Sequence, residues 1–303
     1  MVRRKFNSVA KEDLGEGMRR LAGLLVGLLL LACALGCRVR QGPAQRPRSA
    51  AAAVTIEVFV PCGVVGPFST VREQFEAKHP EMRVKARIEN INVLVQRVLD
   101  GATPDLLLAL GDVEVDRLRR AGRLEEGSLR PLAGNYVGLI APAGNPGQIR
   151  ALEDLAKASA GQVGVAQPEE NSSGGHLRQA LQKLGVWEKM QERVVIARFP
   201  ADVQTMVAQG KVNAGAIYGP CFMEGSEKGG RPQPGQAKGK VTYLLTVPPH
   251  LAGSFVVTAV ACKGAVHRQQ ALAFAEFLCA AENRRAWQQW GFDPLPEADK
   301  GGA

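Results

Sequence analysis

The sequence predicts an α/β fold built as two lobes. From residue 54 onward, stretches with strand periodicity alternate with stretches with helix periodicity. This alternation runs twice, in one series before Gly134 and in a second series after it. Strands that alternate with helices pair in parallel and carry the helices on the faces of the sheet. We therefore expect two lobes, each with its own sheet.

The first series begins with a strand over residues 54–60, in which every second residue is apolar, so that one face can be buried. Phe68, Val71 and Phe75 then follow at helix spacing, and Pro80 ends that helix. The rest of the series comprises a strand over 82–88, a helix over 94–99 and a buried strand over 106–110. Together these elements predict a parallel sheet with helices on its faces.

The second series repeats the alternation. Its predicted elements are strands over 136–141, 162–166, 194–199 and 212–218, with helices over 152–158, 174–184 and 201–208 between them. Residues 224–240 are rich in Gly, Pro and Lys, which predicts an exposed loop. Two apolar strands (243–247 and 255–262) and a helix over 268–280 complete the pattern.

The N-terminus has the layout of a secretory signal. From Met18 the chain reads two arginines, an apolar run from Leu21 to Ala32, small residues and a cysteine. This end resembles a bacterial lipobox, so residues 1–37 are predicted to be a signal peptide that leaves a lipid on Cys37, with Cys33 as the alternative. Residues 1–17 are unlike a signal n-region, so Met18 is a candidate true start. An uncleaved anchor helix is the other interpretation, although the run is short for the roughly 20 residues that span a bilayer.

Charge is concentrated in the same region. The whole chain carries +9, but residues 1–53 hold ten Lys and Arg against three acidic residues, which leaves about +2 for the remainder. That balance argues against a nucleic-acid partner. Residues 38–53 are rich in Arg, Pro and Ala and predict a flexible tether.

Four stretches of the folded part resemble one family. They are QPEENSSGGHLRQALQKLGVWEKM (167–190), VNAGAIYGPCF (212–222), DGATPDLLLALGD (100–112) and FLCAAENRRAWQQWGF (277–292). They are similar to the substrate-binding proteins of molybdate/tungstate ABC importers, which have the type II periplasmic-binding fold, and the resemblance runs from Val54 to Phe292. It implies a ligand cleft between lobe 1 (54–134 with 246–303) and lobe 2 (135–245). It also implies a monomeric, exported, membrane-anchored protein without a cofactor, which passes a small inorganic ligand to an ABC permease.

In that family the oxyanion is held by hydroxyls and by backbone N–H groups at helix starts, where unsatisfied donors and a positive dipole end favour an anion. The resemblance carries these contacts to five positions: Gly63, Asn92, Ser173, Val203 and Tyr218. The bound ligand it implies is molybdate or tungstate. The chain departs from the family pattern where Cys62-Gly63 and Asn90-Ile91-Asn92 replace serine clusters, so backbone N–H groups and amides would stand in for hydroxyls.

Cys62 and Cys221 follow strands of opposite predicted lobes, so both are candidate site residues. Two opposed thiolates would suit a soft ion such as Cu(I), or a thiophilic metalloid such as arsenite. They could instead be small buried apolar residues, or form a disulfide, which an exported compartment permits. Cys262 and Cys279 are expected to pack in the core or to bridge each other.

Two further function classes remain open. Cys62 beside His176 would resemble a thiol–imidazole pair, although the sequence offers no acidic partner to orient it, so we do not expect an enzyme. His176 could also donate to an anion or face solvent. A ligand-sensing module that signals to a membrane partner would use the same fold.

Overall fold

The computed structural model describes residues 53–223, 225 and 229–295. Within these residues the strands form a five-stranded sheet and a six-stranded sheet, both in the compact unit that spans Ala51–Ala303. The predictions for the signal peptide, the lipidated cysteine and nearly all of the tether fall outside this part of the chain. No helix in the described ranges is long and apolar enough to cross a membrane.

The first sheet has the order β2-β1-β3-β11-β4. Its strands are β1 (Val54–Pro61), β2 (Met82–Glu89), β3 (Leu106–Ala109), β4 (Arg130–Asn135) and β11 (Phe255–Val260). β1 pairs in parallel with β2 and with β3, as predicted, whereas β11 is antiparallel to β3 and β4. Ile56, Val58 and Val60 on β1 are fully buried, because helices cover the sheet.

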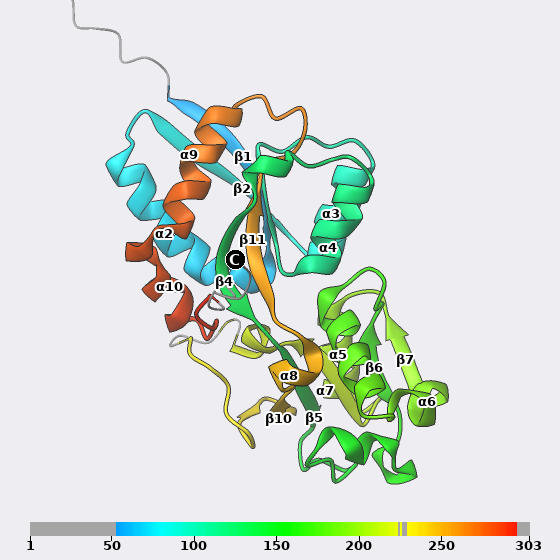
Figure 1. The fold of residues 1–303 in the computed structure, drawn as a ribbon. Helices are drawn as coiled ribbons and strands as arrows, with labels where there is room; N and C mark the ends of the chain where they lie inside the picture. The colour runs from blue at the N-terminus through cyan, green and yellow to red at the C-terminus, as the bar shows by residue number, and fades with distance from the viewer. Residues whose placement is uncertain (1–52, 224, 226–228, 296–303) are drawn as a thin grey trace, which may run out of the picture. The chain divides into compact units, whose positions relative to one another are not determined.

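The helices that pack with this sheet are α2 (Val65–Lys78), α3 (Ile91–Leu99), α4 (Asp112–Arg120), α9 (Arg268–Cys279) and α10 (Arg284–Gln289). Figure 1 shows α2 and α9 on one side of the strands and α3 and α4 on the other. Phe75 of α2 packs against Phe274 of α9 with their ring centroids 4.8 Å apart. Both faces of the sheet are therefore sealed by apolar helix surfaces.

The second sheet has the order β7-β6-β8-β5-β10-β9. Its strands are β5 (Val137–Pro142), β6 (Val163–Ala166), β7 (Val194–Ala197), β8 (Ala214–Tyr218), β9 (Ala237–Lys238) and β10 (Val241–Thr246). Strands β7, β6 and β8 are parallel, and β5 runs antiparallel to β8 and β10. The associated helices are α5 (Ser172–Lys183), α6 (Trp187–Met190), α7 (Pro200–Ala208) and α8 (Pro249–Ala252).

The chain crosses between the sheets twice. It leaves the first sheet at Tyr136, between β4 and β5, and returns from β10 to β11 through α8. Tyr136 is buried at the crossing, its hydroxyl donates to the carbonyl of Gly291 at 3.1 Å, and its own carbonyl accepts from Gly219 N–H at 2.8 Å. A Cβ on Gly219 would lie 1.8 Å from the Tyr136 ring, so this close approach requires glycine.

Several elements differ from the sequence-based expectation. The segment expected to be a helix over 152–158 forms two short 3-10 turns, Leu152–Ala156 and Ala158–Ala160. β9 lies inside the stretch expected to be an exposed loop. The sequence analysis assigned neither α4 nor β4, and α4 proves to carry much of the candidate site.

Candidate functional site

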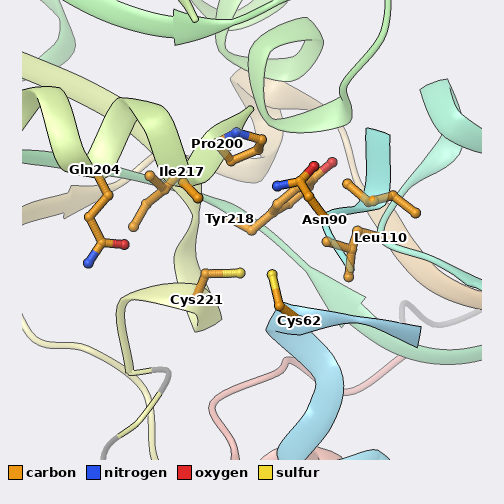
Figure 2. Close-up of a pocket in the computed structure, with 10 residues that line it drawn as sticks. Cys62, Asn90, Leu110, Pro200, Gln204, Ile217, Tyr218 and Cys221 are labelled. Carbon is orange, nitrogen blue, oxygen red and sulfur yellow. The ribbon is translucent and has the colours of Figure 1, made fainter. Parts of the chain in front are cut away.

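The candidate site forms where the turn after a strand of the first sheet meets the turn after a strand of the second sheet. β1 is followed by the turn Cys62–Val64, and β8 is followed by the turn Gly219–Met223. A cavity of about 40 Å³ lies there, which is room for only a few water-sized groups. Its lining comprises Cys62, Asn90, Ile91, Leu110, Pro200, Ala201, Gln204, Ile217, Tyr218 and Cys221 (Figure 2).

Cys62 and Cys221 meet at this cavity from the two sides. Figure 2 shows their sulfur atoms directed toward each other, with Cys62 at the end of β1 and Cys221 in the turn after β8. A Cβ on Gly63 would lie 2.4 Å from Cys221 Sγ, so glycine is what allows the two turns to approach. Neither cysteine is in a disulfide bond, and the same holds for Cys262 and Cys279.

A buried carboxylate, Glu114 on the first turn of α4, lies beside the cavity. It is fully shielded from solvent and accepts hydrogen bonds from the backbone N–H of Ser172 at 3.1 Å, from the Ser172 hydroxyl and from the Tyr218 hydroxyl. We call these three groups of Ser172 and Tyr218 the donor cluster. Ser172 begins α5, so the donor cluster combines a helix N-terminus with a tyrosine at a strand end.

Burial governs the protonation of both partners in this contact. It raises the pKa of Glu114, and the hydrogen bonds from Ser172 and Tyr218 oppose that rise. Burial, followed by the nearby Glu114 charge, also holds the pKa of Tyr218 well above its usual value. The Tyr218 hydroxyl therefore keeps its proton and remains a donor at physiological pH.

Three further polar residues surround the start of α5. Asn171 caps the helix: its Oδ1 accepts from Ser173 N–H at 3.0 Å, and its Nδ2 donates to Asn92 Oδ1 at 2.9 Å. Asn92 is only 6% exposed, and its Nδ2 has no hydrogen-bond partner within the described residues. A buried donor without a partner is costly, so this amide is a candidate donor to a ligand, although Asn92 lines a neighbouring pocket rather than the cavity at Cys62.

His176 lies on the second turn of α5 and is buried. Its Nε2 contacts Asp112 Oδ1 at 2.8 Å, its Nδ1 contacts the Ala252 carbonyl at 2.6 Å, and its ring stacks on Phe255 at 4.1 Å. Burial alone would lower the pKa of His176, but the bonds to Asp112 and Ala252 outweigh it and raise the pKa. Both ring nitrogens are thus engaged by groups other than Cys62, so this conformation contains no thiol–imidazole pair.

Of the seven site residues predicted from the sequence, some line the cavity and others lie away from it. Cys62, Tyr218 and Cys221 line the cavity, Gly63 abuts Cys221, and Asn92 and Ser173 are joined through Asn171. Val203 is fully buried, and its N–H donates within α7 to the Phe199 carbonyl at 3.3 Å. Pro200 and Ala201, at the start of α7, line the cavity instead.

Glu114, Asp112, Ser172 and Asn171 are site residues that the sequence analysis missed. The available signal was Val115 and Leu118 at helix spacing behind Gly111, which would have placed the two acids in the first turn of a helix. Within the described part of the chain, no group of three or more His, Cys, Asp and Glu side chains is placed to hold a metal ion.

Comparison with known proteins agrees with this architecture. A family model described as bacterial extracellular solute-binding protein matches residues 56–293. The chain belongs to that family. Membership in this family supports a solute-binding role rather than catalysis. It also supports a location outside the cytoplasm.

Two curated relatives align over much of the chain. One is the Bacillus subtilis protein YvgL, provisionally named an ABC transporter substrate-binding lipoprotein, which is 20% identical over 88% of this chain and 95% of its own length. The other is the molybdate-binding protein ModA of Mycobacterium tuberculosis, which is 28% identical over 64% of this chain and 72% of its own length. Both relatives are named as binding proteins, in keeping with the solute-binding family to which this chain belongs.

Solved structures share the fold at low identity. The Azotobacter vinelandii periplasmic molybdate-binding protein matches with a TM-score of 0.61 at 18% identity, over 80% of this chain and all of its own. The Mycobacterium tuberculosis sulfate-binding protein SubI matches with a TM-score of 0.62 at 19% identity, over 80% of this chain and 88% of its own. These likenesses confirm the predicted two-lobed type II periplasmic-binding fold.

Proposed function

We propose that this solute-binding protein captures a small oxyanion, molybdate or tungstate in the first place, and delivers it to the permease of an ABC importer. The lobes that enclose the ligand would be residues 54–134 with 246–303, and residues 135–245. The protein would act as a monomer, held at the membrane by a lipid on Cys37, or on Cys33. The support for the anchor is the lipobox-like sequence and the lipoprotein name of one relative.

The observation that carries the proposal is the convergence of neutral donors on an oxygen anion. Ser172 and Tyr218 already hold the carboxylate of Glu114, while Asn92, joined to the start of α5 through Asn171, carries a buried amide donor that lacks a partner in the described residues and lines a neighbouring pocket. Backbone N–H groups at a helix start and uncharged hydroxyls are suited to an oxyanion, because the dipole and the donors act together. Neighbouring Asn90 and Gln204 on the cavity wall could add further amide contacts.

A second candidate ligand is favoured by the thiols. Cys62 and Cys221 direct their sulfur atoms toward each other at the cavity, and its small volume suits a single ion. Two sulfur ligands suit Cu(I) or arsenite rather than a hard oxyanion. This alternative keeps the scaffold and the transport role and changes only the cargo.

Thermal unfolding of the full chain, kept reduced, tests both candidates. Molybdate, tungstate, sulfate, arsenite and Cu(I) would be added one at a time. A ligand at about 100 times its Kd adds about 2.7 kcal/mol of stability, which is a rise in Tm of roughly 5–10 °C for a domain of this size. We expect that rise with molybdate or tungstate.

Cys62→Ser provides the control. A rise with molybdate that persists in the variant supports the oxyanion, and leaves the thiols a packing role. A rise with Cu(I) or arsenite alone, lost in Cys62→Ser or Cys221→Ser, would overturn the oxyanion in favour of the thiophilic ligand. A sensing role would show as binding of the same ligand without transport by a reconstituted permease.

A further inference from the structure

Glu114 is chemically an anion seated on anion-binding groups. Its carboxylate takes the backbone N–H and the hydroxyl of Ser172, together with the hydroxyl of Tyr218, and it is fully shielded from solvent. The α4 backbone reinforces the contact, because Val113 N–H donates to the Ser172 hydroxyl oxygen at 3.0 Å. An oxyanion that used Tyr218 and the start of α5 would need the donors that Glu114 now holds.

We propose that Glu114 is a built-in competitor, which occupies the donor cluster in the absence of ligand and must leave it before an external oxyanion binds. This inference rests on the proposed function and adds the residue that sets its affinity and selectivity. Two oxygen anions on the same donors repel strongly in a buried setting, so both cannot occupy the cluster. The ligand class is therefore an oxyanion with at least two oxygens free to replace those of a carboxylate.

Among the titratable groups around the donor cluster, Glu114 is the one whose protonation is expected to change in mild acid. Asp112 on α4 and His176 on α5 form an ion pair at 2.8 Å, and Tyr218 on β8 stays neutral. The pKa of Asp112 is lowered from 3.8, since its bonds to His176 outweigh burial, and the pKa of His176 is raised from 6.5. In mildly acidic solution both members of the pair therefore stay charged, while Glu114, whose pKa burial raises, is protonated more readily than an ordinary carboxyl group as the pH falls.

A soft ligand makes a contrasting case. Arsenite or Cu(I) bound by Cys62 and Cys221 would use sulfur rather than the donor cluster, so Glu114 could stay in place. The charge on Glu114 thus separates the two ligand classes of the proposed function. Its removal should change oxyanion binding and leave thiol-based binding unaltered.

The test compares the wild-type full chain with Glu114→Gln, which keeps the side-chain shape and removes the charge. Asp116→Asn is the matched control, because Asp116 lies on the same helix, is exposed and pairs with Arg119. Calorimetric titration with tungstate and with sulfate at mildly alkaline pH gives the Kd values. We expect Glu114→Gln to bind both anions about tenfold tighter or more, and Asp116→Asn to match the wild type.

A pH series on the wild type repeats the test without a substitution. Sulfate is the probe, because it stays fully deprotonated in mild acid. Its affinity should rise as the pH falls and should approach that of Glu114→Gln, whose own profile should be flatter. Circular dichroism and thermal unfolding establish that each variant is folded.

The possible failures are distinct. Equal or weaker anion binding by folded Glu114→Gln overturns the inference and leaves the proposed function standing. Absence of oxyanion binding in both proteins overturns the proposed function and the inference together. Binding by Glu114→Gln alone supports both, since it shows a competent donor cluster that the native carboxylate blocks.

Discussion

Tyr218 is the single residue that links the cavity to the buried carboxylate. Its ring lines the cavity beside Cys221, and its hydroxyl donates to Glu114 across the interface between β8 and α4. The backbone N–H of Ser173 also faces this hydroxyl. Because every group around the hydroxyl is buried, removing it leaves a charged acceptor without one of its donors.

Tyr218→Phe is therefore expected to lower the free energy of unfolding by about 1.5–3 kcal/mol, the range for hydrogen bonds to charged groups. The control is Tyr243→Phe, whose buried hydroxyl pairs with Thr246 Oγ1 at 2.7 Å and should cost about 0.5–1.5 kcal/mol. Denaturant unfolding gives both values. Tungstate binding should weaken in Tyr218→Phe alone, and equal losses in the two variants would contradict a special role for Tyr218.

At the scale of elements, the start of α5 organises the site. Asn171 caps the helix and holds Asn92, Ser172 takes part in the donor cluster, and His176 ties the second turn to α8. Gly174 allows this helix to sit against β6, because a Cβ there would lie 2.0 Å from the Ala166 carbonyl oxygen. The position of α5 is thus fixed by backbone contact as well as by side chains.

Asn171→Ala should destabilise the protein by about 1–2 kcal/mol, at the upper end of the cost of a lost N-cap, since it also strips Asn92 Oδ1 of its donor. Asn90 is the comparison, because it caps α3 through Asn92 N–H at 3.0 Å but is only half-buried. Asn90→Ala should cost about 0.5–1 kcal/mol. Urea unfolding would refute the argument if Asn90→Ala proved the more damaging change.

Across the whole molecule, polar contacts join segments that are far apart in the chain. Asp112 with His176, Glu114 with Ser172 and Tyr218, and Asn92 with Asn171 each connect a helix of the first sheet to an element of the second. Conformational change in such a fold means exchanging these contacts for contacts to ligand or solvent. The pair of Asp112 and His176 is the member of this set with opposite charges.

The stability contributed by this pair should depend on pH. The pKa of His176 is raised in the folded state. Its contribution to the free energy of unfolding is therefore complete below the pKa of the unfolded state, near 6.5, and is lost as the pH rises through the pKa of the folded state. The pKa of Asp112 is lowered in the folded state. Its contribution to the free energy of unfolding is therefore present above pH 3.8 and is lost as the pH falls through the pKa of the folded state. The coupling should therefore be greatest in mild acid and should fade in alkaline solution.

A double-mutant cycle with Asp112→Asn and His176→Gln measures this coupling by urea unfolding, once in mild acid and once in alkaline solution. We expect about 0.5–1 kcal/mol in mild acid, because the Asp112 side chain is 55% exposed and solvent screens the pair. The exposed contact between His79 and Glu81 serves as control and should show almost none. A coupling that grew toward alkaline pH would disprove the assigned charges.

The local pattern of apolar residues was sufficient to predict most helices and strands and several site residues. Alternation in residues 54–60 and helix spacing at Phe68, Val71 and Phe75 predicted β1 and α2, because burial of one face imposes those periods. The same reasoning missed α4, whose nine residues mix three acids and three arginines with a few apolar positions. The short segment over 152–158 formed 3-10 turns, since so few residues rarely sustain an α-helix by themselves.

The sequence by itself determined the α/β class, most of the strands other than β4 and β9, and the presence of Cys62, Tyr218 and Cys221 at strand ends. These follow from periodicity and from the resemblance, which are local properties of the chain. Only the tertiary structure decided that Glu114 fills the donor cluster and that His176 pairs with Asp112. Those contacts span 58–104 residues, and their energy depends on a burial that no local pattern encodes.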